Sequence, residues 1–315
     1  MTNPDTIPYL SRETLESLGL TTLDVIASIE EAIAGCEAGS VWSAPKAVIM
    51  PGDGRYMMAA LAAADQPPYL AVKTVVLNPR NSDRGLPQIN GLVTMLDSDT
   101  GLPAAILDGN WITAVRTAGL SAVAARRMAR EDSSVAGFVG TGVQARSHLV
   151  AFADLFPLRK VRIFGRGQAN IDGLCELAES LSLEAEVCSS GEEAIDSADL
   201  VVTSVTFSAD MEPFLDAGSL RPGAFAAITD LAAPWIKDSF ATLDQIVIDD
   251  LAQEAALPNK LADPQHVDGD LAGLVLGKVE VRRKAEDRNA FIFRGHALGD
   301  LALSALALQR SNARA

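Results

Sequence analysis

Small residues at a fixed spacing in the run GFVGTGVQARSHL, from Gly137 to Leu149, are the first feature that points to chemistry. Gly140, Gly142 and Ala145 form the pattern G-x-G-x-x-A between a strand-like apolar run and a helix-like one. The first glycine permits a tight turn, the second lets the backbone approach a pyrophosphate, and the alanine lets the helix pack closely on the strand. The helix start then offers unpaired N–H groups to phosphate. The pattern predicts dinucleotide binding, and the alternative is a plain strand-to-helix turn.

The end of the next strand bears on the choice of nucleotide. A carboxylate that holds the ribose is expected there, about 20 residues after the glycines. The strand reads VRIFGRG, and its end has Gly165, Arg166 and Gly167 without any acid. A carboxylate binds the 2′-hydroxyl of NAD, whereas an arginine forms charge-assisted hydrogen bonds with the 2′-phosphate of NADP. We therefore predict that Arg166 contacts the cofactor and that NADP(H) is favoured over NAD(H); a solvated surface arginine is the alternative.

Three cations upstream of this motif are candidates for substrate binding or catalysis. Lys73 lies in YLAVKTVVL, where apolar neighbours should desolvate the ammonium and lower its pKa. Such a lysine suits proton donation or carboxylate binding; otherwise it is an edge-strand lysine that discourages aggregation. Thr113 is expected to cap a long helix that runs from about Asn110. Arg116 then lies in the first turn, where the helix dipole favours an anion, or else on the surface. Lys46, after Pro45, is a second anion ligand or a solvated side chain.

Composition limits the class of protein and of partner. The chain has 315 residues, 48% of them hydrophobic, which suffices for one large α/β domain or two ordinary ones. A formal charge of −15 argues against binding to nucleic acid or to an anionic membrane. We find no signal-peptide pattern and no long apolar span. Three cysteines at unrelated spacings fit buried free thiols in a cytoplasmic protein, and with three histidines they predict no metal site.

The secondary-structure pattern changes along the chain. A helix capped by Thr21 and Asp24 is followed, from Lys46 to Asp108, by short strands without intervening helices, which predicts a mixed or antiparallel sheet. Further on, strands and helices alternate, as in a parallel sheet that is covered on both faces. The prediction is an α/β fold, with a dinucleotide-binding domain over 115–293 and a smaller α+β domain over 1–114. Residues 294–315 are expected to complete the smaller domain.

Several of these motifs together resemble the ornithine cyclodeaminase/mu-crystallin family over nearly the whole chain. The most specific pieces are DSDTGLPAAILDG, T-x-x-RTA from Thr113 to Ala118, and GTGVQA, followed near the end by AFIFRGHALGD. The resemblance implies a homodimer with a Rossmann NAD(P)-binding domain and a domain for substrate binding and dimerisation. It also implies that Lys73 is the active-site lysine and Arg116 the carboxylate-binding arginine, with Thr117 in the same motif.

A wider set of residues is expected to contact the nucleotide. They lie in the glycine motif, at the ends of the strands that follow, and just before the C-terminal helix. The predicted cofactor-binding residues are Thr117, Gly140, Thr141, Gly142, Val143, Gln144, Arg166, Thr203, Ser204 and Gly295.

The chain also departs from the pattern of the family that it resembles, at positions that matter for catalysis. Lys46 stands where the family usually has an arginine, so a bidentate contact becomes a point charge. Tyr56 takes the place of an acid that cyclodeaminases use, and their catalytic aspartate falls on Ala232. Asp230 lies two positions before Ala232, and we predict it as a catalytic residue beside Lys73.

The favoured function is an NAD(P)H-dependent reductase or dehydrogenase that acts on an imino acid/amino acid pair. Arg116 and Lys46 would bind the substrate carboxylate, while Lys73 would supply or orient a proton. One alternative is an ornithine cyclodeaminase-type lyase that recycles a bound NAD, and the missing acids disfavour it. The other is a crystallin-like, NADPH-dependent ligand-binding protein, which the presence of both Lys73 and Arg116 disfavours.

Overall fold

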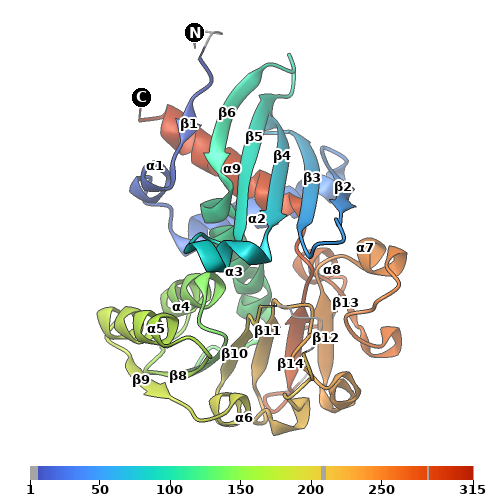
Figure 1. Cartoon of the computed structure of the whole chain (residues 1–315). Coiled ribbons are helices and arrows are strands. Elements are labelled where there is room, and N and C mark those ends of the chain that lie inside the picture. The colour runs from blue at the N-terminus through green and yellow to red at the C-terminus, as the bar shows by residue number, and fades with distance from the viewer. Residues whose placement is uncertain (1–5, 207–210, 282–283, 315) are drawn as a thin grey trace. The chain divides into compact units, whose positions relative to one another are not determined.

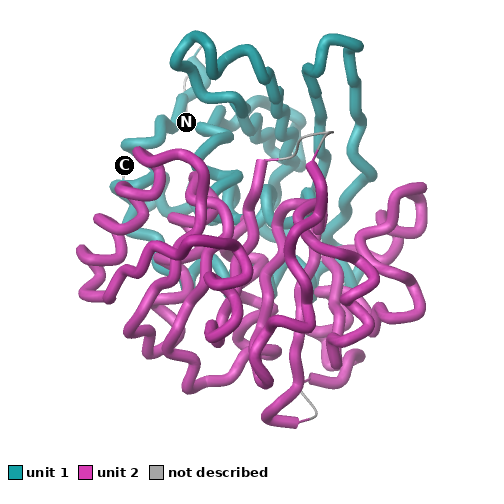
Figure 2. Tube along the Cα trace, turned by 60° about the horizontal axis from the view of Figure 1, so that its bottom comes forward, with its two compact units in different colours: residues 1–116, 296–315 teal, residues 117–295 magenta. Residues whose placement is uncertain are grey.

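The structure is a computed structural model that describes residues 6–206, 211–281 and 284–314. The chain divides into two compact units, one of residues 1–116 with 296–315 and one of residues 117–295 (Figure 1, Figure 2). Each unit has its own β-sheet, and helix α3 (Gly109–Met128) contributes residues to both. The predicted α/β class is confirmed.

Unit 1, residues 1–116 with 296–315, contains a six-stranded sheet in the order β1-β6-β5-β4-β3-β2. Only β1 and β6 pair in parallel; the other neighbours are antiparallel, as consecutive strands joined by short connections must be. The strands are β1 (Tyr9–Leu10), β2 (Val41–Ile49), β3 (Tyr56–Asp65), β4 (Pro68–Leu77), β5 (Ile89–Asp97) and β6 (Pro103–Asp108), with the 3₁₀ helix η1 (Pro79–Arg84) before β5.

One face of this sheet is covered by helices. In Figure 1, α9 (Ala297–Asn312) runs behind the strands, and it contacts β2 to β5 as well as α2 (Thr22–Ala38). The predicted cap of α2 is confirmed, since Thr21 and Asp24 bond each other's backbone N–H groups, at 2.9 and 3.1 Å. A short helix, α1 (Arg12–Ser17), precedes α2.

Unit 2, residues 117–295, is built on an eight-stranded sheet in the order β13-β12-β14-β11-β10-β7-β8-β9, and every pair in it is parallel. The six strands β9-β8-β7-β10-β11-β14 follow the Rossmann order, and β12 and β13 extend the sheet beyond β14. The order reverses between β7 and β10, which is where such sheets bind ligands at their carboxyl ends. The strands are β7 (Val135–Val139), β8 (Lys160–Phe164), β9 (Glu184–Val187), β10 (Leu200–Thr203), β11 (Phe225–Ile228), β12 (Gln245–Ile248), β13 (Gly269–Asp270) and β14 (Asn289–Ile292).

Helices and loops connect these strands, as the alternating pattern predicted. Strands β10, β11, β12 and β14 are buried at every position, as a parallel sheet with covered faces requires. The helices are α4 (Val143–Leu155), α5 (Gln168–Ser180), α6 (Gly191–Ile195), α7 (Leu251–Ala256) and α8 (Leu271–Val275), with the 3₁₀ helices η2 (Ala217–Ser219), η3 (Lys237–Thr242) and η4 (Pro264–His266).

The expectations about membrane spans and about the cysteines can be compared with the structure. Among the residues described, no helix is both long enough and apolar enough to traverse a bilayer. The three cysteines form no disulfide, and Cys188 is buried while Cys175 is half-buried. Cys36 is exposed, so the expectation that all three are buried is wrong for Cys36.

Candidate active site

A cavity of about 490 Å³ lies at the carboxyl ends of β7, β8 and β10 in unit 2. This is the point of the sheet where the strand order reverses, so the topology alone favours a ligand there. Five of the predicted cofactor-binding residues line the cavity: Gly140, Thr141, Gly142, Arg166 and Ser204. The glycine motif and the end of the second strand, which are distant in sequence, are therefore brought to one cavity.

The glycine loop leaves room for a pyrophosphate. A Cβ at Gly140, which has φ of +98°, would lie 2.6 Å from the carbonyl oxygen of Ser204, so only glycine fits this approach. A Cβ at Gly142 would meet no atom within 4 Å, which leaves open space beside the backbone. Gly142 also precedes α4 without any side-chain cap, so the first N–H groups of that helix are available to an anion. The hydroxyl of Ser204 is buried without a hydrogen-bond partner. These features fit a dinucleotide.

The other predicted cofactor residues lie outside the lining of this cavity. Val143 and Gln144 begin α4, Thr117 is buried in α3, and Gly295 follows β14 with φ of +92°. Thr203 is fully buried, and its hydroxyl donates to Asp230. Sequence reasoning missed other residues of the lining, among them Phe164, Asn170, Met211, Glu212 and Phe214. Phe164 ends β8 and Asn170 lies in the first turn of α5, so their positions could have identified them; the last three lie in a loop without a motif.

Arg166 is the exposed residue of the lining that bears most on nucleotide choice. It follows β8 and precedes Gly167, the N-cap of α5, which offers no side-chain hydrogen bond to that helix. No carboxylate stands at this strand end, although Glu212 lines the same cavity. An anion beside Arg166 would therefore meet both a guanidinium and the unpaired N–H groups of a 13-residue helix.

Asp230 is held inside unit 2 and does not line the cavity. Its carboxylate accepts hydrogen bonds from the Thr203 hydroxyl at 3.1 Å and from the Val205 N–H at 3.0 Å. Burial raises the pKa of Asp230 to about 6, although these hydrogen bonds act in the opposite direction. The next two residues, Leu231 and Ala232, have left-handed φ angles of 60° and 58°, a conformation that L-residues adopt only when their surroundings enforce it. The contacts of Asp230 stabilise this turn.

Lys73 lies in the middle of the unit 1 sheet. It is on β4, between β3 and β5, with only 1% of its surface exposed, so the edge-strand alternative is wrong. Its register partners, Ala60 and Val93, are buried and apolar, on the face that α9 covers. The ammonium donates to Asp300 Oδ1 at 2.7 Å. Asp300 was not among the predicted site residues.

Arg116 is also buried, with 5% exposed, so the surface-arginine alternative is wrong. Its expected place in the first turn of the helix is wrong as well, because α3 begins at Gly109, where Asp108 accepts from Trp111 N–H. Arg116 Nε lies 3.0 Å from Asp300 Oδ1, an ion-pair distance, but this N–H and Nη1 have no hydrogen-bond partner. Buried donors usually have a hydrogen-bond partner, so these N–H groups of Arg116 are available to an anionic ligand.

The charges around Lys73 favour an anionic ligand. Burial, followed by repulsion from Arg116, lowers the pKa of Lys73 to about 8. Asp300 acts in the opposite direction, and half-buried Lys46 adds a smaller repulsion. The Asp300 carboxylate thus contacts two cations, Lys73 and Arg116, so these three groups carry an excess of positive charge that a substrate carboxylate would neutralise. The structure brings the three predicted cations of unit 1 into one electrostatic cluster.

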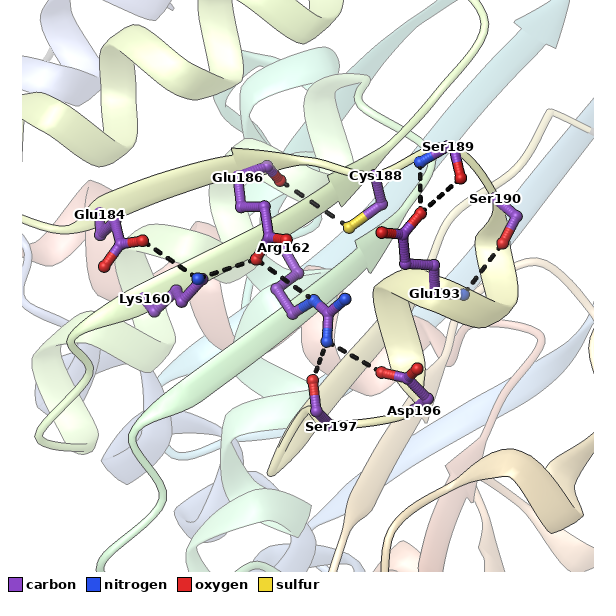
Figure 3. A network of polar contacts seen from close by, with 10 residues as sticks. All are labelled: Lys160, Arg162, Glu184, Glu186, Cys188, Ser189, Ser190, Glu193, Asp196 and Ser197. Atoms are coloured by element: carbon purple, nitrogen blue, oxygen red, sulfur yellow. Dashed lines mark hydrogen bonds and ion pairs between the residues drawn. The ribbon is translucent and has the colours of Figure 1, made fainter.

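Among the described residues, Glu186, Cys188 and Glu193 come near to a metal-ligand arrangement, with ligand atoms within 4.8 Å of one another (Figure 3). The Glu186 carboxylate, however, lies 2.8 Å from Lys160 Nζ and 3.6 Å from Arg162 Nε. Glu193 accepts two hydrogen bonds from the residue that precedes the N-cap of α6. These groups are therefore engaged in tying β8, β9 and α6 together, and we interpret the cluster as structural.

Known proteins resemble this chain in sequence and in fold. The model of the ornithine cyclodeaminase/mu-crystallin family matches residues 9–313. Ketimine reductase mu-crystallin of Rattus norvegicus is 33% identical over 202 residues, which are 64% of this chain and 62% of that protein. Alanine dehydrogenase of Archaeoglobus fulgidus is 26% identical over 94% of this chain and 92% of its own length. The solved structure of Thermococcus litoralis Δ(1)-pyrroline-2-carboxylate reductase, in complex with NADH and L-proline, superposes with a TM-score of 0.89 at 26% identity, covering 98% of each chain.

Proposed function

The chain belongs to the ornithine cyclodeaminase/mu-crystallin family, and we propose that it is an NAD(P)H-dependent reductase or dehydrogenase of an imino acid/amino acid pair. The observation that supports this most directly is the buried cluster of Lys73, Arg116 and Asp300, in which the guanidinium keeps donors without a partner. The names of two relatives, a ketimine reductase and a pyrroline-2-carboxylate reductase, describe reduction of a C=N bond, and the second name includes a carboxylate. A carboxylate-binding cluster with a proton-bearing lysine suits that chemistry.

The residues of the chain divide the work of this reaction. Reduction of a C=N bond adds a hydride to carbon, which bound NAD(P)H supplies, and a proton to nitrogen. Arg116 binds the substrate carboxylate through its free donors, and Lys46 adds a point charge. Lys73 Nζ holds the proton for the imine nitrogen. Its lowered pKa of about 8 keeps the amine mostly protonated at neutral pH, yet close enough to that pH to release the proton.

We propose further that NADP(H) is the preferred cofactor. In this proposal the Gly140–Gly142 loop, the start of α4 and the Ser204 hydroxyl hold the pyrophosphate, and Arg166 holds the 2′-phosphate; the cavity that these residues line supports it. The relative from Thermococcus litoralis was solved with NADH, so the family resemblance alone does not decide between the nucleotides. The absence of a carboxylate directly after β8 supports binding of the 2′-phosphate of NADP(H).

Substitution of Arg166 measures this preference. We expect the wild-type protein to bind NADPH at least about tenfold more tightly than NADH, which corresponds to roughly 1.4 kcal/mol. Arg166→Ala should remove most of that difference and leave NADH affinity nearly unchanged, because only the phosphate contact is lost. Calorimetric titration of both nucleotides gives the four dissociation constants. Arg159→Ala, an exposed arginine just before β8, serves as the control. Equal affinities of the wild type for the two nucleotides would contradict the proposal.

A substrate screen tests the proposed reaction. Cyclic imines, and 2-oxo acids mixed with ammonia or methylamine, are incubated with the protein and either NADPH or NADH. We expect oxidation of the nucleotide with at least one imine that has an adjacent carboxylate, and little with the same imine without it, because Arg116 then has no anion to bind. Tight NADPH binding without turnover of any compound would favour the ligand-binding alternative.

We also propose that two copies of the chain pair through the open face of the unit 1 sheet. The strand register places a set of large apolar side chains on the face opposite Lys73, each of them 37–64% exposed. They are Trp42, Ile49, Met57, Leu61, Val76 and Leu92. An exposed apolar surface of this kind is typical of a protein–protein interface, and a second copy of this chain is the occupant that the family resemblance implies.

A cytoplasmic location is a further proposal. It is supported by three cysteines that form no disulfide, since thiols persist in a reducing compartment. The net charge of −15 adds the expectation that neither nucleic acid nor an anionic membrane is a partner.

A further inference from the structure

Asp300 joins the two cations of the candidate site. It lies in the first turn of α9, which begins after His296, whose Nδ1 accepts from Leu298 N–H at 3.1 Å. The Asp300 side chain is only 4% exposed. A single oxygen, Oδ1, contacts both Lys73 Nζ at 2.7 Å and Arg116 Nε at 3.0 Å. The carboxylate thus connects β4, α3 and α9.

We propose that Asp300 is a positioning residue that holds the ammonium of Lys73 and the guanidinium of Arg116 in place for the reaction. The inference rests on the proposed function, because it assumes that these two cations bind and protonate an imino acid. Asp300 acts through these two cations: its oxygen contacts Lys73 and Arg116, and the proposal gives it no contact with the substrate.

Electrostatics explains why such a residue is required. The charged groups that face Lys73 are Asp300 from α9, Arg116 from α3 and, at longer range, Lys46 from β2; its neighbours on β3 and β5 are apolar. Two buried cations without a counter-ion would repel each other, and the lysine would release its proton. The carboxylate removes both problems, since it attracts each cation and accepts a hydrogen bond from the ammonium.

The geometry also separates two tasks of Arg116. Asp300 approaches the Nε edge of the guanidinium, which leaves Nη1 as a buried donor for the substrate. A bound substrate carboxylate would then be a second anion close to Lys73 and would raise its pKa. The alkaline limb of kcat should accordingly lie at higher pH than that of kcat/KM, since kcat reports the complex and kcat/KM the free enzyme.

The proposal is tested by the titration of Lys73 itself. The full-length protein is prepared with ¹³C at lysine Cε, the Lys73 signal is assigned by its loss in Lys73→Arg, and its shift is followed against pH. The wild-type midpoint is expected near pH 8. Asp300→Asn should lower this midpoint, and the alkaline limb of kcat/KM for imine reduction, by about one pH unit or more, because a nearby counter-charge is lost. Asp300→Glu should recover part of the shift.

Two further variants make the result decisive. Asp65→Asn, an exposed carboxylate at the end of β3, should leave the Lys73 midpoint unchanged. If Asp300→Asn does not fold, Arg116→Gln replaces it: loss of the repelling cation should move the midpoint to higher pH. An unchanged Lys73 midpoint in the folded Asp300→Asn or Arg116→Gln protein would overturn the assignment. If the Lys73 midpoint shifts in Asp300→Asn but the wild-type protein reduces no imine, the result would support the role of Asp300 and contradict the proposed function.

Discussion

Replacement of Lys73 by methionine is expected to reduce the kcat of imine reduction by about 10²–10⁴-fold, the range that a positioned proton donor contributes. Methionine has a similar length and packs among the apolar neighbours of β4, but it has no proton to give. NADPH affinity should not change, because the nucleotide cavity lies wholly in unit 2. Steady-state kinetics and nucleotide titration of the same preparation measure the two quantities.

Lys73→Arg separates charge from proton transfer. Arginine keeps the positive charge beside Asp300 but does not release its proton at any accessible pH. We therefore expect its kcat to stay as low as that of Lys73→Met. A turnover near that of the wild type would show that the reaction needs only the charge. Reduction by the wild type should also fall as pH rises through about 8, and amine oxidation should increase over the same interval, because the two directions need opposite protonation states of Lys73.

Replacement of Arg116 by alanine is expected to act mainly on substrate binding. Loss of hydrogen bonds to a charged carboxylate is worth roughly 1.5–3 kcal/mol, so KM should rise by about 10- to 150-fold. kcat should fall much less than in Lys73→Met, because Arg116 binds substrate and transition state alike. Initial rates over a wide range of substrate concentrations resolve the two parameters.

Two comparisons sharpen this second prediction. Arg116→Lys keeps the charge without the planar pair of donors, so its KM should lie between those of the wild type and Arg116→Ala. A substrate analogue without the carboxylate should be reduced equally poorly by the wild type and by Arg116→Ala. If the substitution instead impairs the analogue as strongly as the carboxylate substrate, Arg116 does not bind the carboxylate.

Much of the fold and of the reaction class was predictable because the signals are local or depend on several motifs together. The capping pair of Thr21 and Asp24, and the glycine loop between β7 and α4, are set by neighbouring residues. The family prediction, which combined motifs along the chain, is confirmed by the match over residues 9–313. The prediction of a reductase or dehydrogenase acting on C=N and C–NH bonds is confirmed by the relatives.

The sequence by itself determined which residue types are available: a lysine in an apolar strand, an arginine in a small-residue helix, and a glycine loop without a following acid. Only the tertiary structure decided which partners the lysine and the arginine contact. Asp300 is 227 residues from Lys73, and no periodicity of β4 or α9 indicates that a lysine on one will face an aspartate on the other. Strand order placed Lys73 inside the sheet, and the cap at Asp108 placed Arg116 two turns into α3. Periods of 2 and 3.6 residues fix the faces of strands and helices, whereas partners across a core depend on how those faces pack.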